Sequence, residues 1–154
     1  MQPLLKPFVG LVLVAGIAGS ASAQSPFAKP QDAIKYRQSA MFIMGQQFGR
    51  IAAVVKGKRP FDKAEVARSA AIVEEMSKLP WEGFVAGTDK GKTHAKPDIW
   101  TEAAKFKSRQ EKLEQESAKL AEVAKGGDLD AIKVQFGATG KACKSCHDDF
   151  KKKD

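Results

Sequence analysis

Four segments of this 154-residue chain repeat apolar residues at helical spacing, and breaks rich in Pro or Gly separate them. We predict helices over about 30–56, 62–79, 98–126 and from 128 onward, with a long loop over 80–97. No alternating strand pattern of any length competes with these helices. Helices of similar length with short outer connections predict an all-α fold, an antiparallel four-helix bundle.

The predicted first helix carries two apolar rows. A row at spacings of three, four and seven suits a core-facing seam, and a second row beside it gives the helix another apolar face. Such a helix can face its own core and a partner subunit at once. The first row is Ile34, Met41, Met44, Phe48, Ile51 and Val55, and the second is Tyr36, Ala40, Ile43 and Val54.

Residues 1–23 have the pattern of a secretory signal peptide. Lys6 gives a weak positive start, an apolar run of about a dozen residues follows, and Ala21, Ser22 and Ala23 supply small residues at the cleavage position. The apolar run is too short to span a bilayer comfortably, although an N-terminal membrane anchor is the alternative. We predict one domain over 24–154, exported to the periplasm, with no membrane span.

The chain is basic, with a formal net charge of +8. A basic protein can bind nucleic acid, an anionic membrane surface or an acidic protein. Most lysines alternate with acids along the predicted helices, which is typical of a solvated helix face, and export argues against nucleic acid. The exception is the run of three lysines at 151–153, which could favour docking to an acidic redox partner.

The chemistry of the chain is concentrated in Cys-Lys-Ser-Cys-His at 143–147. Cys143 and Cys146 are the only cysteines, and His147 is one of two histidines. This is the Cys-x-x-Cys-His pattern of covalent c-type haem attachment. On a helix the three side chains project from one face, so two thioether bonds can hold the porphyrin edge while the imidazole binds the iron. The same face is apolar, which would place the haem in the bundle core.

Three other uses of the motif are weaker. A thioredoxin-type dithiol needs a strand–helix context, which the sequence lacks. A disulfide across two intervening residues would close a very short loop and so contribute little to stability. A tetrahedral zinc site needs four ligands, and His94 is the one further Cys or His that could join. We therefore predict one covalent haem c per chain, with His147 as iron ligand.

A C-terminal attachment motif, four helices and a signal peptide together resemble the cytochrome c′ family, within the class II cytochromes c. The family implies a mostly five-coordinate, high-spin iron that binds NO and CO, a role in electron carriage, and a homodimer packed through the first two helices. The resemblance covers nearly the whole chain after residue 23. The segments that carry it are FAKPQDAIKYRQSAM, FGRIAAVVKGKRPFD, MSKLPWEGFVAGTDKG, AKPDIWTEAAKFK and GKACKSCHDDFKKK.

The resemblance also implies roles for residues around the haem. Cys143 and Cys146 would bind the vinyl groups, with His147 as the proximal ligand. Met41 matches the distal position. Arg37 and Gln38 match a first-helix pair that lies against the haem, with Arg37 near a propionate, and Trp81, Phe84 and Phe106 match aromatic positions around the pocket. Lys151 matches a basic residue one turn after the proximal histidine. His94 stands where many relatives have an acidic residue near the haem edge.

The role of Met41 distinguishes two possible functions. Its thioether can ligate the iron and give a low-spin His/Met electron carrier, or it can pack over an open iron as a steric gate to NO and CO. The resemblance favours the gate. Ligation by His94 is a weaker option, because a histidine in a Gly- and Lys-rich loop is usually solvated. An enzyme, such as a peroxidase or nitrite reductase, needs distal acid–base groups, and the distal position is apolar.

Overall fold

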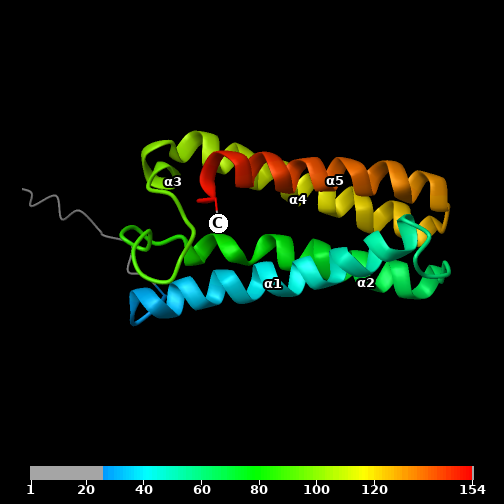
Figure 1. Cartoon of the computed structure of the whole chain (residues 1–154), viewed down its shortest axis with the longest axis horizontal. Coiled ribbons are helices and arrows are strands. Elements are labelled where there is room, and N and C mark those ends of the chain that lie inside the picture. Colours follow the sequence, from blue (N-terminus) through cyan, green and yellow to red (C-terminus); the bar gives the residue numbers. More distant parts are fainter. Residues whose placement is uncertain (1–25, 154) are drawn as a thin grey trace, which may run out of the picture.

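Four long helices, packed antiparallel, make up the molecule (Figure 1). The computed structural model describes residues 26–153, so the predicted signal peptide over 1–23 lies outside the described residues. Within 26–153 no helix combines the length and the apolar character that crossing a membrane requires. The all-α four-helix bundle predicted from the sequence is confirmed. Its helices are α1 (Pro30–Val55), α2 (Lys63–Lys78), α4 (Ala103–Gly126) and α5 (Leu129–Phe150).

Capping residues fix the ends of these helices. The Asp62 carboxylate accepts a hydrogen bond from the Glu65 amide at 2.9 Å and caps α2. Asp128 caps α5 in the same way, by accepting from the amides two and three residues later. Gly127 makes the turn between α4 and α5 with a φ of +81°, a left-handed conformation that favours glycine. These signals are visible in the sequence, so the predicted boundaries agree with the structure to within one or two residues.

The predicted helix over 98–126 is wrong in one respect, because the structure divides it. A short helix, α3 (Asp98–Thr101), ends at Glu102, whose φ of −110° and ψ of 43° are not helical, and α4 then begins. The cause is tertiary. Ile99 is buried and the Trp100 indole donates to the Phe84 carbonyl at 3.0 Å, so α3 is held against the preceding loop. That loop itself begins with a 3₁₀ turn, η1 (Pro80–Gly83).

The bundle has two different ends. At the closed end, where α1 leads into α2 and α4 into α5, aliphatic and small side chains form a continuous buried cluster. The pocket end holds η1, α3 and the C-terminal residues, and its cluster is mainly aromatic. The closed-end cluster is Ile51, Val54, Val66, Ala70, Leu120, Ala121, Ala124 and Ile132.

A strap (residues 84–97) crosses the pocket end and joins the end of α5. The Lys96 amide donates to the Phe150 carbonyl at 3.0 Å, and the Lys152 amide donates to the His94 carbonyl at 2.7 Å. The Lys96 ammonium also donates to the last carbonyls of α5. Such bonds satisfy helix-end acceptors and place a cation at the negative end of the helix dipole. The strap therefore fixes the C-terminal segment beside the pocket.

Candidate functional site

Two adjoining cavities open between α1 and α5 at the pocket end. Their volumes are about 170 and 240 Å³. Four side chains line both cavities: Met41, Trp81, Cys146 and His147. The first cavity is completed by Arg37, Phe84, Thr93, His94, Ala95, Ile99, Phe106, Phe150 and Lys151, and the second by Met44, Gly45, Phe48, Val73, Leu113, Thr139 and Cys143.

The α5 side of the cavities carries the predicted attachment motif. Because Cys143, Cys146 and His147 are three and four positions apart on a continuous helix, they share a face, and that face borders the cavities. Both cysteines are half-buried and free, so the disulfide weighed from the sequence is not formed. Among residues 26–153 no three His, Cys, Asp or Glu side chains gather as a metal site would require, which leaves the zinc alternative unsupported.

The protonation states of the two cysteines and His147 are compatible with uncharged thioether bonds and a neutral imidazole ligand. Burial raises the pKa of Cys143, and burial together with the charges of Asp149 and Cys143 raises the pKa of Cys146 to about 11. Few thiolates are then present at neutral pH, which is unfavourable for a redox dithiol or a thiolate–metal site. A thioether carries no charge and can lie in these surroundings. Partial burial, followed by the nearby Lys151 charge, lowers the pKa of His147 and favours the neutral imidazole that binds metals.

The α1 side of the cavities contributes Met41. This residue is half-buried, comes from a different helix than the motif, and borders both cavities with His147. Its neighbours in the second cavity are mostly apolar, among them Phe48 and Leu113. The thioether therefore lies where it could either bind a metal held by His147 or block access to it.

Aromatic rings close the first cavity. Trp81 lies 5.8 Å from Phe106 between ring centroids, and Phe84 lies 4.9 Å from Phe106, both at steep interplanar angles. The Trp81 indole donates to the Ser77 carbonyl at 2.7 Å, so its orientation is fixed. Edge-to-face pairs of this kind form rigid apolar walls, suited to a flat aromatic group.

Arg37 is a buried cation without an acidic partner in the described part of the chain. It is 3% exposed, and its guanidinium donates to the Gly83 carbonyl, to the Thr88 hydroxyl and carbonyl, and to the Thr93 hydroxyl at 2.5–2.8 Å. Its central carbon also lies 4.6 Å from the centre of the Phe84 ring. All these acceptors are neutral, and a buried charge is costly unless it is paired. The first cavity thus offers a fixed positive charge to an anionic group.

The structure brings together all but one of the residues that the sequence predicted for the site. Gln38 lines neither of the two cavities, because it is exposed on α1 and donates to the Lys92 carbonyl at 3.0 Å. His94 and Lys151 are exposed residues that line the first cavity. Thr88 and Thr93, the acceptors for Arg37, were missed. Threonine in a loop carries no sequence signal for such a role.

The residues present fit a haem. Paired neutral thiols and an imidazole lie on one helix, a thioether lies on the helix opposite, and the cavities between them are largely apolar and aromatic. A cation without a counter-ion borders one cavity, where an acidic substituent of the porphyrin would be stabilised. Cys143 and Cys146 would hold the group covalently, and His147 would bind its iron.

Comparison with known proteins gives a consistent result. The family model described as cytochrome c′ matches residues 32–151. Cytochrome c′ of Rubrivivax gelatinosus is 49% identical over 128 residues, which cover 82% of this chain and 99% of the relative. Cytochrome c prime from Shewanella frigidimarina superposes with a TM-score of 0.81 at 46% identity, covering 82% of this chain and 99% of the other. The nitric oxide complex of a leucine-to-alanine variant of cytochrome c prime from Alcaligenes xylosoxidans superposes with a TM-score of 0.78 at 44% sequence identity. The match covers 83% of this chain and 99% of the other.

Proposed function

Since this chain belongs to the cytochrome c′ family and so carries haem c, we propose that it is a periplasmic protein that binds NO and CO and carries electrons. Haem iron supplies a centre that binds diatomic gases and exchanges one electron. In the proposal Cys143 and Cys146 tether the group, and His147 is the sole protein ligand of a five-coordinate, high-spin iron. Arg37 faces an acidic substituent.

Met41 is the observation that carries the gas-binding proposal. It borders both cavities opposite His147, and it is only half-buried. A gas molecule that approaches from the α1 side must displace this thioether. Moving atoms into a packed core costs roughly 1–3 kcal/mol, which weakens gas binding by that amount. Most of its neighbours in the second cavity are apolar, so we propose binding rather than catalysis, which would need distal acid–base groups.

The same geometry supports one alternative. The Met41 thioether borders the same cavities as His147, and a methionine in that position can be a sixth ligand. The protein would then be a low-spin His/Met electron carrier. A ferrous absorption spectrum separates the two: a methionine–iron band would favour ligation, and a high-spin spectrum that shifts with CO would favour the gate.

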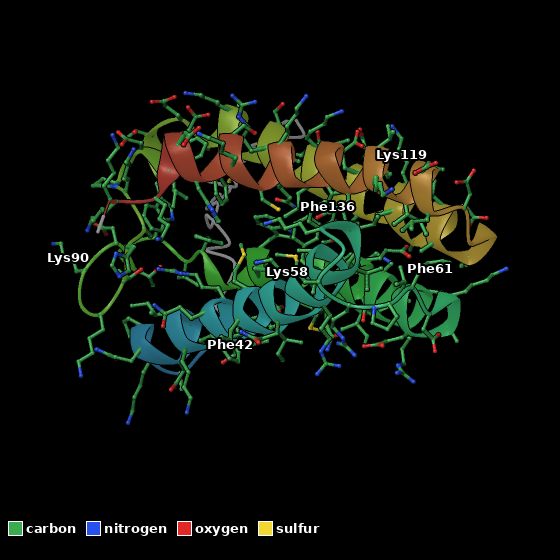
Figure 2. The ribbon with its side chains drawn as sticks, turned by 45° about the vertical axis from the view of Figure 1, so that its right-hand side comes forward. Phe42, Lys58, Phe61, Lys90, Lys119 and Phe136 are labelled. Atoms are coloured by element: carbon green, nitrogen blue, oxygen red, sulfur yellow. The ribbon has the colours of Figure 1, made fainter. Side chains whose placement is uncertain are left out.

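Relatives and exposed surface support the rest of the proposal. The Alcaligenes xylosoxidans variant is described as a nitric oxide complex, which supports NO as a ligand of this chain as well. Phe42 is 66% exposed and Ile43 is 43% exposed on α1, and Phe42 lies on the outer face of the bundle (Figure 2). We propose that this apolar surface lies in a homodimer packed through α1 and α2, and that the chain is exported by its signal peptide.

The gate is tested by Met41→Ala. Removing the thioether should raise the CO affinity of the ferrous protein about tenfold, since 1.4 kcal/mol corresponds to a factor of ten. Met76→Ala is a matched control, because Met76 borders neither cavity. It packs against the buried cluster of Met44, Val73, Leu113 and Ala142. CO titrations of both variants decide the matter. An unchanged affinity in Met41→Ala would count against the gate.

A further inference from the structure

Many lysines on the helices of this protein are neutralised by neighbouring acids. These lysines are paired with acids three or four positions away, as in Lys78 with Glu74 at 3.3 Å and Lys133 with Asp130 at 2.9 Å. Exposed pairs of this kind cancel much of the local charge. The paired lysines are Lys78, Lys105, Lys107, Lys112, Lys119, Lys125, Lys133 and Lys144.

A second group of lysines gathers at the pocket end, and the fold assembles it from two distant segments. The strap provides three lysines and the C-terminal segment another three, and the backbone bonds at 94–96 and 150–152 bring the segments together. Lys90 marks the outer tip of the strap (Figure 2). We call this set the basic patch: Lys90, Lys92, Lys96, Lys151, Lys152 and Lys153.

Most lysines of the basic patch lack an acidic partner among residues 26–153. In the described range, Lys90, Lys92, Lys96, Lys152 and Lys153 have no carboxylate within ion-pair distance, and the ammonium groups of Lys96 and Lys152 donate to backbone carbonyls. The nearest acids on α5 are already engaged, Asp148 by Lys144 and Asp149 by Lys105 and Arg109. Asp89 and Asp98 are the acids of the strap and of α3 beside it, too few to balance the patch.

The basic patch lies beside the first cavity, because Lys151 of the patch lines it and the strap residues Thr93 and Ala95, next to Lys92 and Lys96, line it too. His94 of the strap and His147 of the motif line the same cavity. A molecule docked on these lysines would therefore lie close to the cavity that His147 of the attachment motif also lines. Charged groups near a site steer oppositely charged partners toward it and raise association rates.

We propose that the basic patch is the docking surface for an acidic one-electron carrier protein. The inference rests on the electron-carrying part of the proposed function and adds the place and the charge of the partner. One electron leaves the reduced partner, which is oxidised, and reduces the ferric protein; no bond or proton is transferred. An anionic membrane fits less well, because the large exposed apolar side chains of the described chain are Phe42, Ile43, Phe61, Leu79 and Val134, none in the strap or the C-terminal segment.

A charge-reversal pair with a matched control tests the proposal. Lys90→Glu/Lys92→Glu reverses two exposed charges of the basic patch, while Lys56→Glu/Lys58→Glu makes the same change in net charge at the closed end. Reduced plant-type ferredoxin, an acidic one-electron donor, is mixed with each ferric holoprotein in a stopped-flow instrument. At about 10 mM ionic strength the patch variant should react about tenfold more slowly than wild type, and the control by less than about twofold.

The difference between the two variants should shrink at about 0.5 M ionic strength, where charges are screened within a few ångströms. Equal slowing of both variants, or of neither, overturns the proposal. Vesicles of phosphatidylglycerol form a second arm: loss of sedimentation with them in the patch variant, at an unchanged ferredoxin rate, makes the patch a membrane site and also overturns it. Reduction of the same samples by dithionite, a small reductant that needs no docking surface, distinguishes failure of the docking surface from failure of electron carriage.

Discussion

The closed end and the pocket end of the bundle are made of the same four helices but are packed in different ways. At the closed end Leu120 and Ile132 are fully buried and Ile51 is 1% exposed, all within one aliphatic cluster. At the pocket end the helices enclose two cavities, rigid aromatic rings and a buried arginine. One end is filled by the chain itself, and the other leaves space that the chain does not fill.

The difference follows from which helices touch. Neighbouring pairs α1 with α2, α2 with α4, and α4 with α5 pack extensively, whereas α1 and α5 make few direct contacts. The cavities lie along this weakest pair, between the helix with Met41 and the helix with the attachment motif. Atoms that border a cavity lose dispersion contacts on that side. The closed end therefore has close packing that the region around the cavities lacks.

The largest expected effect comes from hollowing the closed end. Leu120→Ala should lower the free energy of unfolding by about 3 kcal/mol, because a fully buried leucine leaves a cavity that the aliphatic cluster cannot refill. Met41 is only half-buried, so Met41→Ala removes less buried apolar surface and should cost only about 1 kcal/mol. Chemical denaturation of both holoproteins measures the contrast. Similar losses would mean that the two ends do not differ in packing as described.

A smaller effect is expected from Arg37→Gln at the pocket end. Arg37 joins α1 to η1 and the strap by four hydrogen bonds, and bonds to a charged group contribute about 1.5–3 kcal/mol. We expect a loss of about 2 kcal/mol and faster amide exchange over 84–94, with little change at the closed end. Arg59→Gln is the control, since Arg59 makes an exposed pair with Glu65. Unchanged strap exchange in Arg37→Gln would contradict this role.

The smallest effect concerns Glu116, on α4 between the two ends. Hydrogen bonds from Lys112 and then Gln135 lower its pKa from 4.5 to about 2. A lowered folded-state pKa stabilises the protein above the unfolded pKa, and this contribution is lost as the pH falls from about 4.5 toward 2. Because Lys112 and Lys119 are more than half exposed, we expect only about 1 kcal/mol at pH 7.

The comparison of wild type with Glu116→Gln by chemical denaturation at several pH values tests this contribution. The two proteins should differ by that amount at pH 7, and most of the difference should be lost by about pH 2, where about half of the Glu116 carboxylates of the folded protein are protonated. Glu122→Gln provides the exposed control, since Glu122 makes only a surface pair with Lys125. A Glu116→Gln difference that persists unchanged to pH 2 would show that shape, not charge, accounts for it.

Local signals predicted the bundle well. The caps Asp62 and Asp128 and the glycine after α4 fixed helix ends because their effect is confined to neighbouring residues. The break at Glu102 was not predictable, because no Pro or Gly marks it and its cause is the contact of Trp100 with Phe84. The pairing of the strap with the C-terminal segment likewise depends on backbone bonds between distant residues.

The candidate site likewise contains residues that the sequence predicted and residues that it missed. Cys143, Cys146 and His147 were found from spacing alone, and their roles stay predictions that the cavities support. Thr88 and Thr93 were missed because they act on Arg37 from 51 and 56 residues away. The role of Gln38 against the haem also stays a prediction, since its side chain is exposed. The sequence predicted only the C-terminal half of the basic patch, because the strap lysines join it through folding.

Mass spectrometry of the exported, denatured protein examines the pocket end most directly. If the cavities between α1 and α5 hold a haem that is covalently attached to α5, the wild-type polypeptide retains the mass of one haem after unfolding. The Cys143→Ser/Cys146→Ser variant retains none. A wild-type chain with the mass of the bare polypeptide would contradict the assignment of Cys143 and Cys146 as the attachment residues.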